Sequence, residues 1–205
     1  MSPLIELLGN PPEWQDVDGY TAVRYTKEPW GGVSVFTLNI QPRQWSEPGT
    51  VTATGNISLR PSPSCEVHFP YREDCDKDPC EALGAIRVRS GYLTHGQDYW
   101  WTTKIGDDWH PHLIESMRLG FELADRYCSS AKVLQMLVDG DPRVTENRVA
   151  FLLGTPGLVY LLARVEGHSD LVAKAEHELS QDSYRGYFEE YRPRIEAVIR
   201  RYIKS

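Results

Sequence analysis

The chain has 205 residues, a length at which one hydrophobic core is the ordinary arrangement. Apolar residues make up 40% of the chain and charged residues 25%, which excludes a chain that is disordered throughout. The formal net charge of −7 at pH 7 disfavours binding to nucleic acid or to an anionic membrane surface. We therefore expect a single domain over residues 1–205, with a mainly β portion over 1–106 and a helical portion over 107–205.

The chain shows no pattern typical of an export signal or a membrane anchor. The apolar stretch near the N-terminus covers only Leu4 to Leu8 and contains Glu6. A longer apolar stretch, Val149 to Ala163, is interrupted by glycine and proline. Both stretches are shorter than the roughly 20 residues that span a bilayer. We expect a cytoplasmic protein without membrane association, whose four cysteines are reduced thiols or metal ligands.

Short runs of apolar and β-branched residues predict strands in the first half of the chain. The runs are Thr21 to Tyr25, Val33 to Ile40, Thr50 to Leu59, Ile86 to Gly91 and Asp98 to Thr103. In the third run, apolar residues alternate with Thr52, Thr54, Asn56 and Ser58, a two-residue period that predicts a half-buried strand. Because short turns containing glycine or proline join these runs, the sequence favours an antiparallel sheet.

The segment from Gly91 to Trp101 predicts a β-hairpin rich in aromatic residues. Adjacent tryptophans on a strand point to opposite faces, so one can anchor the core while the other reaches solvent or a partner. We interpret five residues as an aromatic contact surface: Arg89, His95, Asp98, Trp100 and Trp101. The alternative is that both tryptophans are packed beneath helices, where aromatic side chains are often found.

From residue 107 onward the hydrophobic period lengthens to about 3.6 residues, which predicts helices. The first helix starts after Asp107 or Asp108, with Pro111 in its first turn. The later helices are predicted over Ala131 to Val138, Val144 to Leu153, Leu158 to Val165, Ser169 to Leu179 and Tyr184 to Ile203. Pro193 should kink or split the last of them. The predicted class is α+β, with an N-terminal antiparallel sheet packed against helices and an all-helical C-terminal part.

The segment Pro61 to Leu83 has no clear period and contains four residues of metal-binding type, Cys65, His68, Cys75 and Cys80. Three thiolates and one imidazole can hold a structural zinc ion in a tetrahedral site. The alternative is that these are ordinary surface residues, since the gap between the second and third of them is wider than usual in zinc sites. No other cofactor is expected.

Possible catalytic groups are few. His95, His110 and His112 together with Asp107 support the alternative of a metal-dependent hydrolase or a nucleic-acid-processing enzyme. The sequence lacks a His-Glu-x-x-His run, a phosphate-binding glycine loop and a Gly-x-Ser-x-Gly elbow. We therefore expect no catalytic residue and favour a non-enzymatic protein that binds another protein. The acidic net charge favours a basic partner.

Three segments, in this order, resemble a bacterial family known as domain of unknown function 4304, over roughly residues 15 to 140. They are Phe36-Thr37-Leu38-Asn39-Ile40, Ile86 to Leu93, and Asp98-Tyr99-Trp100-Trp101 followed by a helix. The resemblance implies an antiparallel sheet backed by helices and transfers no catalytic residue. Members are similar in size to accessory proteins of bacterial toxins, so it also suggests an immunity protein or a subunit of a bacterial defence system.

Overall fold

The computed structural model describes residues 15–16, 21–27, 33–41, 45, 47–65, 67, 86–104, 106–107, 110–127, 129–141 and 153–203. The fold is α+β, as predicted. Six described strands form one sheet, in which all pairs are antiparallel. The strands are β1 (Gln15–Asp16), β2 (Thr21–Lys27), β3 (Val33–Ile40), β4 (Thr50–Arg60), β5 (Ile86–Arg89) and β6 (Trp101–Lys104).

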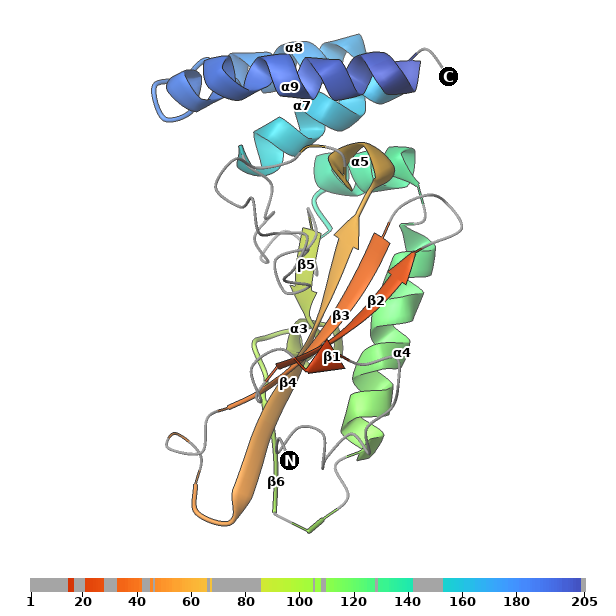
Figure 1. Ribbon diagram of the computed structural model, residues 1–205, viewed down its shortest axis with the longest axis vertical. Helices are drawn as coiled ribbons and strands as arrows, with labels where there is room; N and C mark the ends of the chain where they lie inside the picture. Colours follow the sequence, from red (N-terminus) through yellow and green to blue (C-terminus); the bar gives the residue numbers. More distant parts are fainter. Residues whose placement is uncertain are drawn as a thin grey trace.

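Most described helices follow the sheet in the chain, as the change of hydrophobic period predicts. They are α2 (Ser62–Cys65), α3 (Ser90–His95), α4 (His110–Arg126), α5 (Ser130–Asp139), α7 (Gly154–Glu166), α8 (Ser169–Leu179) and α9 (Arg185–Ile203). In Figure 1, α4 runs along the sheet, whereas α7, α8 and α9 form a group at one end of it with α5 between. The helix predicted over Val144 to Leu153 lies outside the described residues, apart from Leu153.

The strand order is β1-β2-β3-β4-β5, and β6 also pairs with β4. Because β3 occupies one edge of β4, β5 and β6 share the other edge end to end. Asn56 to Leu59 pair with β5, and Thr50 to Ala53 pair with β6. The predicted hairpin is therefore wrong, since Ser90–His95 is helical and β6 pairs with β4 instead of β5. A short helix in that place lets the chain return to a more distant part of the same edge.

Strand β4 lies at the centre of the sheet and is buried on both faces from Thr52 to Leu59. On one face, Ile57 contacts α4, where a Cβ added to Gly120 would lie 3.3 Å from the Cβ of Ile57. The other face carries the polar residues Thr54, Asn56 and Ser58, which are also buried. The prediction of a half-buried strand is therefore wrong, because a two-residue period reports polarity and not which face is covered.

Two glycines end helices of the C-terminal half. Gly140 follows α5 and Gly167 follows α7, with φ angles of 69° and 80° that favour glycine. Helix α9 runs from Arg185 to Ile203 as one element that includes Pro193, so the proline does not split it. Pro193 is exposed, and tertiary packing of Ile195 and Ile199 below it holds the helix together.

The buried apolar residues of the sheet and of the C-terminal helices belong to one cluster. From the sheet it includes Leu59 and Ile86, and from the C-terminal helices it includes Leu161, Leu179 and Ile199. Helix α5 contacts α7, and α2 contacts both α7 and α9, so these helices join the two parts. None of the described helices combines the length and the apolar character needed to cross a bilayer.

Candidate functional site

Between β5 and β6, the chain leaves the edge of β4 and returns to it further along. We call the segment from Arg89, the last residue of β5, to Trp101, the first residue of β6, the aromatic turn. Two side-chain hydrogen bonds tie this turn to β4 where the ladder is interrupted. The Ser90 hydroxyl donates to the carbonyl of Gly55 at 2.6 Å, and the Thr54 hydroxyl donates to the carbonyl of Tyr99 at 3.2 Å. The turn is therefore anchored to the most buried strand of the sheet.

The turn has close backbone packing at one end and a glycine cap in the middle. Gly91 lies so near the backbone of Tyr99 that an added Cβ would be 2.4 Å from its nitrogen. Gly96 ends α3 with a φ of 68°, and its N–H donates to the carbonyl of Tyr92 at 3.2 Å. Glycine is required at the first position by space and favoured at the second by backbone conformation.

Three aromatic rings gather on one side of the turn. The rings of His95 and Tyr99 are stacked, with centroids 3.8 Å apart and an interplanar angle of 11°. Trp101 meets Tyr99 edge to face at 5.6 Å and His95 at 6.2 Å. The Thr94 hydroxyl lies 2.6 Å from Nδ1 of His95, which orients the imidazole. Tyr99 remains 36% exposed, so the stack is accessible from solvent.

A charged pair and the second tryptophan lie on the other side of the turn. Arg89 donates to Asp98 Oδ2 at 2.5 Å, and its guanidinium lies 5.4 Å from the centroid of the Trp100 ring. Arg89 is opposite Asn56 in the sheet, whereas Trp101 is opposite Ala53. Side chains alternate between the two faces along β4, so Asn56 and Ala53, three positions apart, lie on opposite faces, and so do their partners Arg89 and Trp101. Trp100 lies against Arg89, and the two tryptophans therefore point to opposite sides. Both are half-buried.

The structure places the five residues of the predicted aromatic contact surface in two groups on opposite sides of the turn, with Arg89, Asp98 and Trp100 in one group and His95 and Trp101 in the other. Sequence reasoning missed Tyr99, which stacks on His95 and is the central ring of the group. The signal was present, because Tyr99 is two residues before Trp101 and so shares its side of an extended segment. Neither tryptophan is fully buried beneath helices.

The predicted metal ligands fall mostly beyond the described residues. Cys65 ends α2, and His68, Cys75 and Cys80 lie outside the described part of the chain. The zinc site therefore stays a prediction. Within the described ranges, no group of three histidine, cysteine, aspartate or glutamate side chains is placed to hold a metal ion.

The residues of the enzymatic alternative are also only partly visible. Asp107 is exposed, in a turn where its N–H donates to the carbonyl of Lys104. His110 and His112 belong to the first turn of α4, and their side chains are outside what the structure describes. His95 contacts Thr94, Tyr99 and Trp101. None of these three is a usual metal ligand or a general acid or base near neutral pH.

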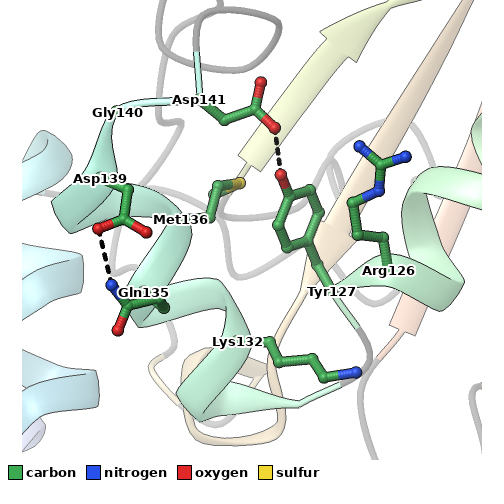
Figure 2. A pocket seen from close by; sticks show the side chains of 8 residues that line it. All are labelled: Arg126, Tyr127, Lys132, Gln135, Met136, Asp139, Gly140 and Asp141. Carbon is green, nitrogen blue, oxygen red and sulfur yellow. Dashed lines mark hydrogen bonds between the residues drawn. The ribbon is translucent and has the colours of Figure 1, made fainter.

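A second site, which the sequence reasoning did not find, is a cavity of about 580 Å³ between the end of α4 and helix α5. Figure 2 shows Arg126 and Asp139 on opposite sides of it, with Tyr127 and Met136 between them. Lys132, Gln135, Gly140 and Asp141 complete the lining. The Tyr127 hydroxyl donates to the Asp141 carboxylate, and Gln135 Nε2 donates to Asp139 Oδ1 at 2.7 Å.

The charges along α5 oppose the dipole of the helix. Lys132 lies in the first turn and Asp139 is the last residue, although anions are favoured at the N-terminus of a helix and cations at the C-terminus. Each such placement costs about 0.3–1 kcal/mol at the surface. The Ser129 hydroxyl, which accepts from the backbone N–H of Lys132 at 3.2 Å, offsets part of this cost.

Comparisons with protein-family models, curated proteins and solved structures find no match to this chain. The resemblance to domain of unknown function 4304 therefore stays a prediction.

Proposed function

We propose that the protein is a non-enzymatic binding protein that recognises a basic protein partner through the aromatic turn. The observation that carries the proposal is the accessible stack of His95, Tyr99 and Trp101 on a turn held by β4. Aromatic and arginine residues supply most of the binding energy at protein interfaces. A turn that is already ordered also loses little conformational entropy when a partner binds.

The chemistry of the turn favours a partner rich in lysine or arginine. The face of an aromatic ring attracts a cation within about 6 Å of its centroid. The turn itself contains one such contact, between Arg89 and Trp100. The net charge of −7 would add long-range attraction for a basic protein and increase the rate of encounter.

The family resemblance supports a narrower form of the proposal, in which the partner is a bacterial toxin or a subunit of a defence system. An immunity protein must bind its toxin tightly and needs no reactive group of its own. In the narrower form, coexpression of this chain relieves the growth arrest caused by the partner. The enzymatic alternative has no supporting observation among the described residues, and we do not propose it.

The proposal can be tested by affinity purification of the tagged chain from its native host, followed by mass spectrometry of the bound proteins. We expect a stoichiometric partner with an excess of lysine and arginine. The Tyr99→Ala variant should retain far less of it, because this change removes the central ring of the stack. Tyr187→Ala is the matched control, since Tyr187 is a 55% exposed tyrosine on α9.

Two further readouts separate a specific partner from background. The partner should dissociate with increasing salt, because salt screens the attraction between the acidic chain and a basic partner beyond a Debye length of about 10 Å at 0.1 M salt. The purified partner should also bind the purified wild-type chain when no other protein is present. Recovery of the chain without any stoichiometric protein would refute the proposal, and so would equal retention by the Tyr99→Ala and Tyr187→Ala variants.

A further inference from the structure

We propose that His95 is the residue of the aromatic turn that selects a basic partner, by accepting a hydrogen bond at Nε2 from a lysine or arginine N–H group. The inference rests on the proposed function and deepens it. It starts from the contacts of the Thr94 hydroxyl, which together assign the proton of the neutral imidazole.

The Thr94 hydroxyl has three polar neighbours and one proton. It lies 3.1 Å from the carbonyl oxygen of Ser90, 3.3 Å from that of Gly91 and 2.6 Å from Nδ1 of His95. Carbonyl oxygens only accept, so the imidazole is the one neighbour of the three that can donate. Every contact is satisfied when the hydroxyl donates to the carbonyls and Nδ1–H of His95 donates to the hydroxyl oxygen.

This assignment leaves Nε2 of His95 without a proton. A neutral imidazole carries a single N–H, so Nε2 is an acceptor when Nδ1 is the donor. His95 is exposed, and Nε2 has no hydrogen-bond partner among the described residues. The bond to Thr94 and the stack on Tyr99, with centroids 3.8 Å apart, together fix the orientation of the ring. The turn therefore presents an oriented acceptor to a donor from outside the chain.

An acceptor on an acidic protein is suited to a cation that carries N–H groups. Lysine and arginine side chains have donors and no acceptor, whereas a carboxylate has acceptors alone. A carboxylate at Nε2 would place one lone pair against another, and the net charge of −7 would repel it as well. Hydrogen bonding at His95 and long-range attraction thus select the same class of partner. A hydrogen bond from a charged donor is also about twice as strong as one between neutral groups.

Protonation of His95 changes this surface and leaves the anchoring of the ring in place. The imidazolium keeps its Nδ1–H, so the hydrogen bond to Thr94 remains. Nε2 gains a proton and becomes a donor on a cationic ring, which then repels the cation of the partner. Histidine makes this change between pH 5 and 8. Acidification within that range should therefore release the partner without unfolding the turn.

The surroundings of His95 carry no second group that titrates in the same range. The rings in contact with it belong to Tyr99 and Trp101. The charged residues of the turn, Arg89 and Asp98, pair with each other on its other side. None of these four side chains is of a type that changes its charge between pH 5 and 8. Among the described residues no charged side chain contacts the imidazole, so a pH effect within the turn is assigned to His95.

The first test is NMR spectroscopy of the full chain without a partner, with ¹⁵N in the histidine rings. At pH 8 we expect a proton on Nδ1 of His95 and none on Nε2, with the signals assigned by their loss in His95→Phe. In Thr94→Val, which removes the hydroxyl, the proton should no longer be confined to Nδ1. A proton on Nε2 of the wild type would overturn the inference, and so would an unchanged tautomer in Thr94→Val.

The second test measures the affinity of the partner recovered by affinity purification, at pH 7.5 and at pH 5.5. Wild-type binding should weaken about tenfold at the lower pH, a loss typical of one charged hydrogen bond. His95→Phe keeps a ring to stack on Tyr99 and has no ring nitrogen, so it should bind more weakly at pH 7.5 and respond much less to pH. His177→Phe removes an exposed histidine of α8 and should behave as the wild type does.

The outcomes distinguish this inference from the proposed function. Equal pH dependence of the wild-type and His95→Phe complexes would overturn the inference and leave the proposed function standing. Recovery of the chain without a stoichiometric partner would overturn both, whatever the tautomer of the free chain. Acetylation of the partner's lysines separates the two donors, because the pH dependence then disappears if lysine supplies the hydrogen bond and persists if arginine does.

Discussion

A Cβ atom placed on Gly91 would lie 2.4 Å from the backbone nitrogen of Tyr99 and 2.8 Å from its carbonyl oxygen. This close approach brings the start of α3 against the segment that leads into β6. It fixes where the ring of Tyr99 stands relative to His95, with which it stacks. The aromatic turn therefore depends on a residue that has no side chain.

The first prediction concerns Gly91. The change Gly91→Ala should lower the free energy of unfolding by about 1–3 kcal/mol, because the methyl group meets backbone atoms that have little freedom to move. Urea unfolding followed by circular dichroism measures the loss. The matched control is Gly186→Ala in α9, where an added Cβ meets no atom within 4 Å.

We expect the control to be neutral or to stabilise the protein by up to about 1 kcal/mol, since alanine favours a helix over glycine. Gly91→Ala should also weaken partner binding, because it displaces Tyr99. Equal stability of the Gly91→Ala and Gly186→Ala variants would show that the turn is less rigid than the structure indicates.

The second prediction compares two buried hydroxyls on the polar face of β4. Thr54 donates to the carbonyl of Tyr99, whereas the hydroxyl of Ser58 has no hydrogen-bond partner within the described ranges. Both residues are 0% exposed. Thr54→Val should destabilise the protein by about 1 kcal/mol through the lost bond, and Ser58→Ala should be neutral or stabilising.

Thermal unfolding of both variants checks this prediction. The order of the two stabilities is the decisive quantity. If Ser58→Ala is the more destabilising change, the Ser58 hydroxyl has a partner that the described residues do not supply.

The third prediction concerns the pH dependence of the contact between α7 and α9. Burial, together with the hydrogen bond to Glu196 and the charge of its carboxylate, raises the pKa of Tyr160 to about 12. An unfolded tyrosine has a pKa of about 10. Because the folded-state pKa is the higher one, the stabilisation is complete below about pH 10 and is lost as the pH rises from there through the folded-state pKa near 12.

The variant Tyr160→Phe should therefore lose less stability than the wild type between pH 9 and pH 11, with a difference of at most about 1.4 kcal/mol for each pH unit above 10. Urea unfolding of both proteins at these pH values isolates the effect from the other tyrosines. Arg164 pairs with Glu196 at 3.0 Å and should keep the two helices linked in the variant. Parallel pH profiles of the two proteins would contradict the prediction.

The fourth prediction concerns Pro193 in α9. A proline inside a helix removes one backbone hydrogen bond and crowds the preceding turn. Since Pro193 is exposed and makes no contribution to the buried side of α9, Pro193→Ala should raise the stability by about 1–3 kcal/mol. An increase in the melting temperature checks this, with the exposed change Arg194→Ala as the neighbouring control. A decrease would indicate that the proline stabilises a bend on which the packing of Ile195 depends.

The sequence by itself determined the class of the fold and most element positions. Residue periods near two and near 3.6 are local properties, so β3, α5, α8 and α9 lie close to where the pattern predicts. Glycine at the ends of α5 and α7 is a local signal too, because the left-handed conformation is a property of a single residue. Five residues of the aromatic turn could also be named from a stretch of 13 residues, Arg89 to Trp101, although Tyr99 was not among them.

The tertiary structure alone decided how these elements meet. Which edge of β4 receives β6 depends on a pairing between residues about 50 positions apart, for which no local period exists. Burial of the polar side of β4 likewise follows from what covers the sheet and not from the alternation within the strand. The cavity beside α5 is lined by residues from the end of α4 and from α5, and only the packing of these two helices brings them together.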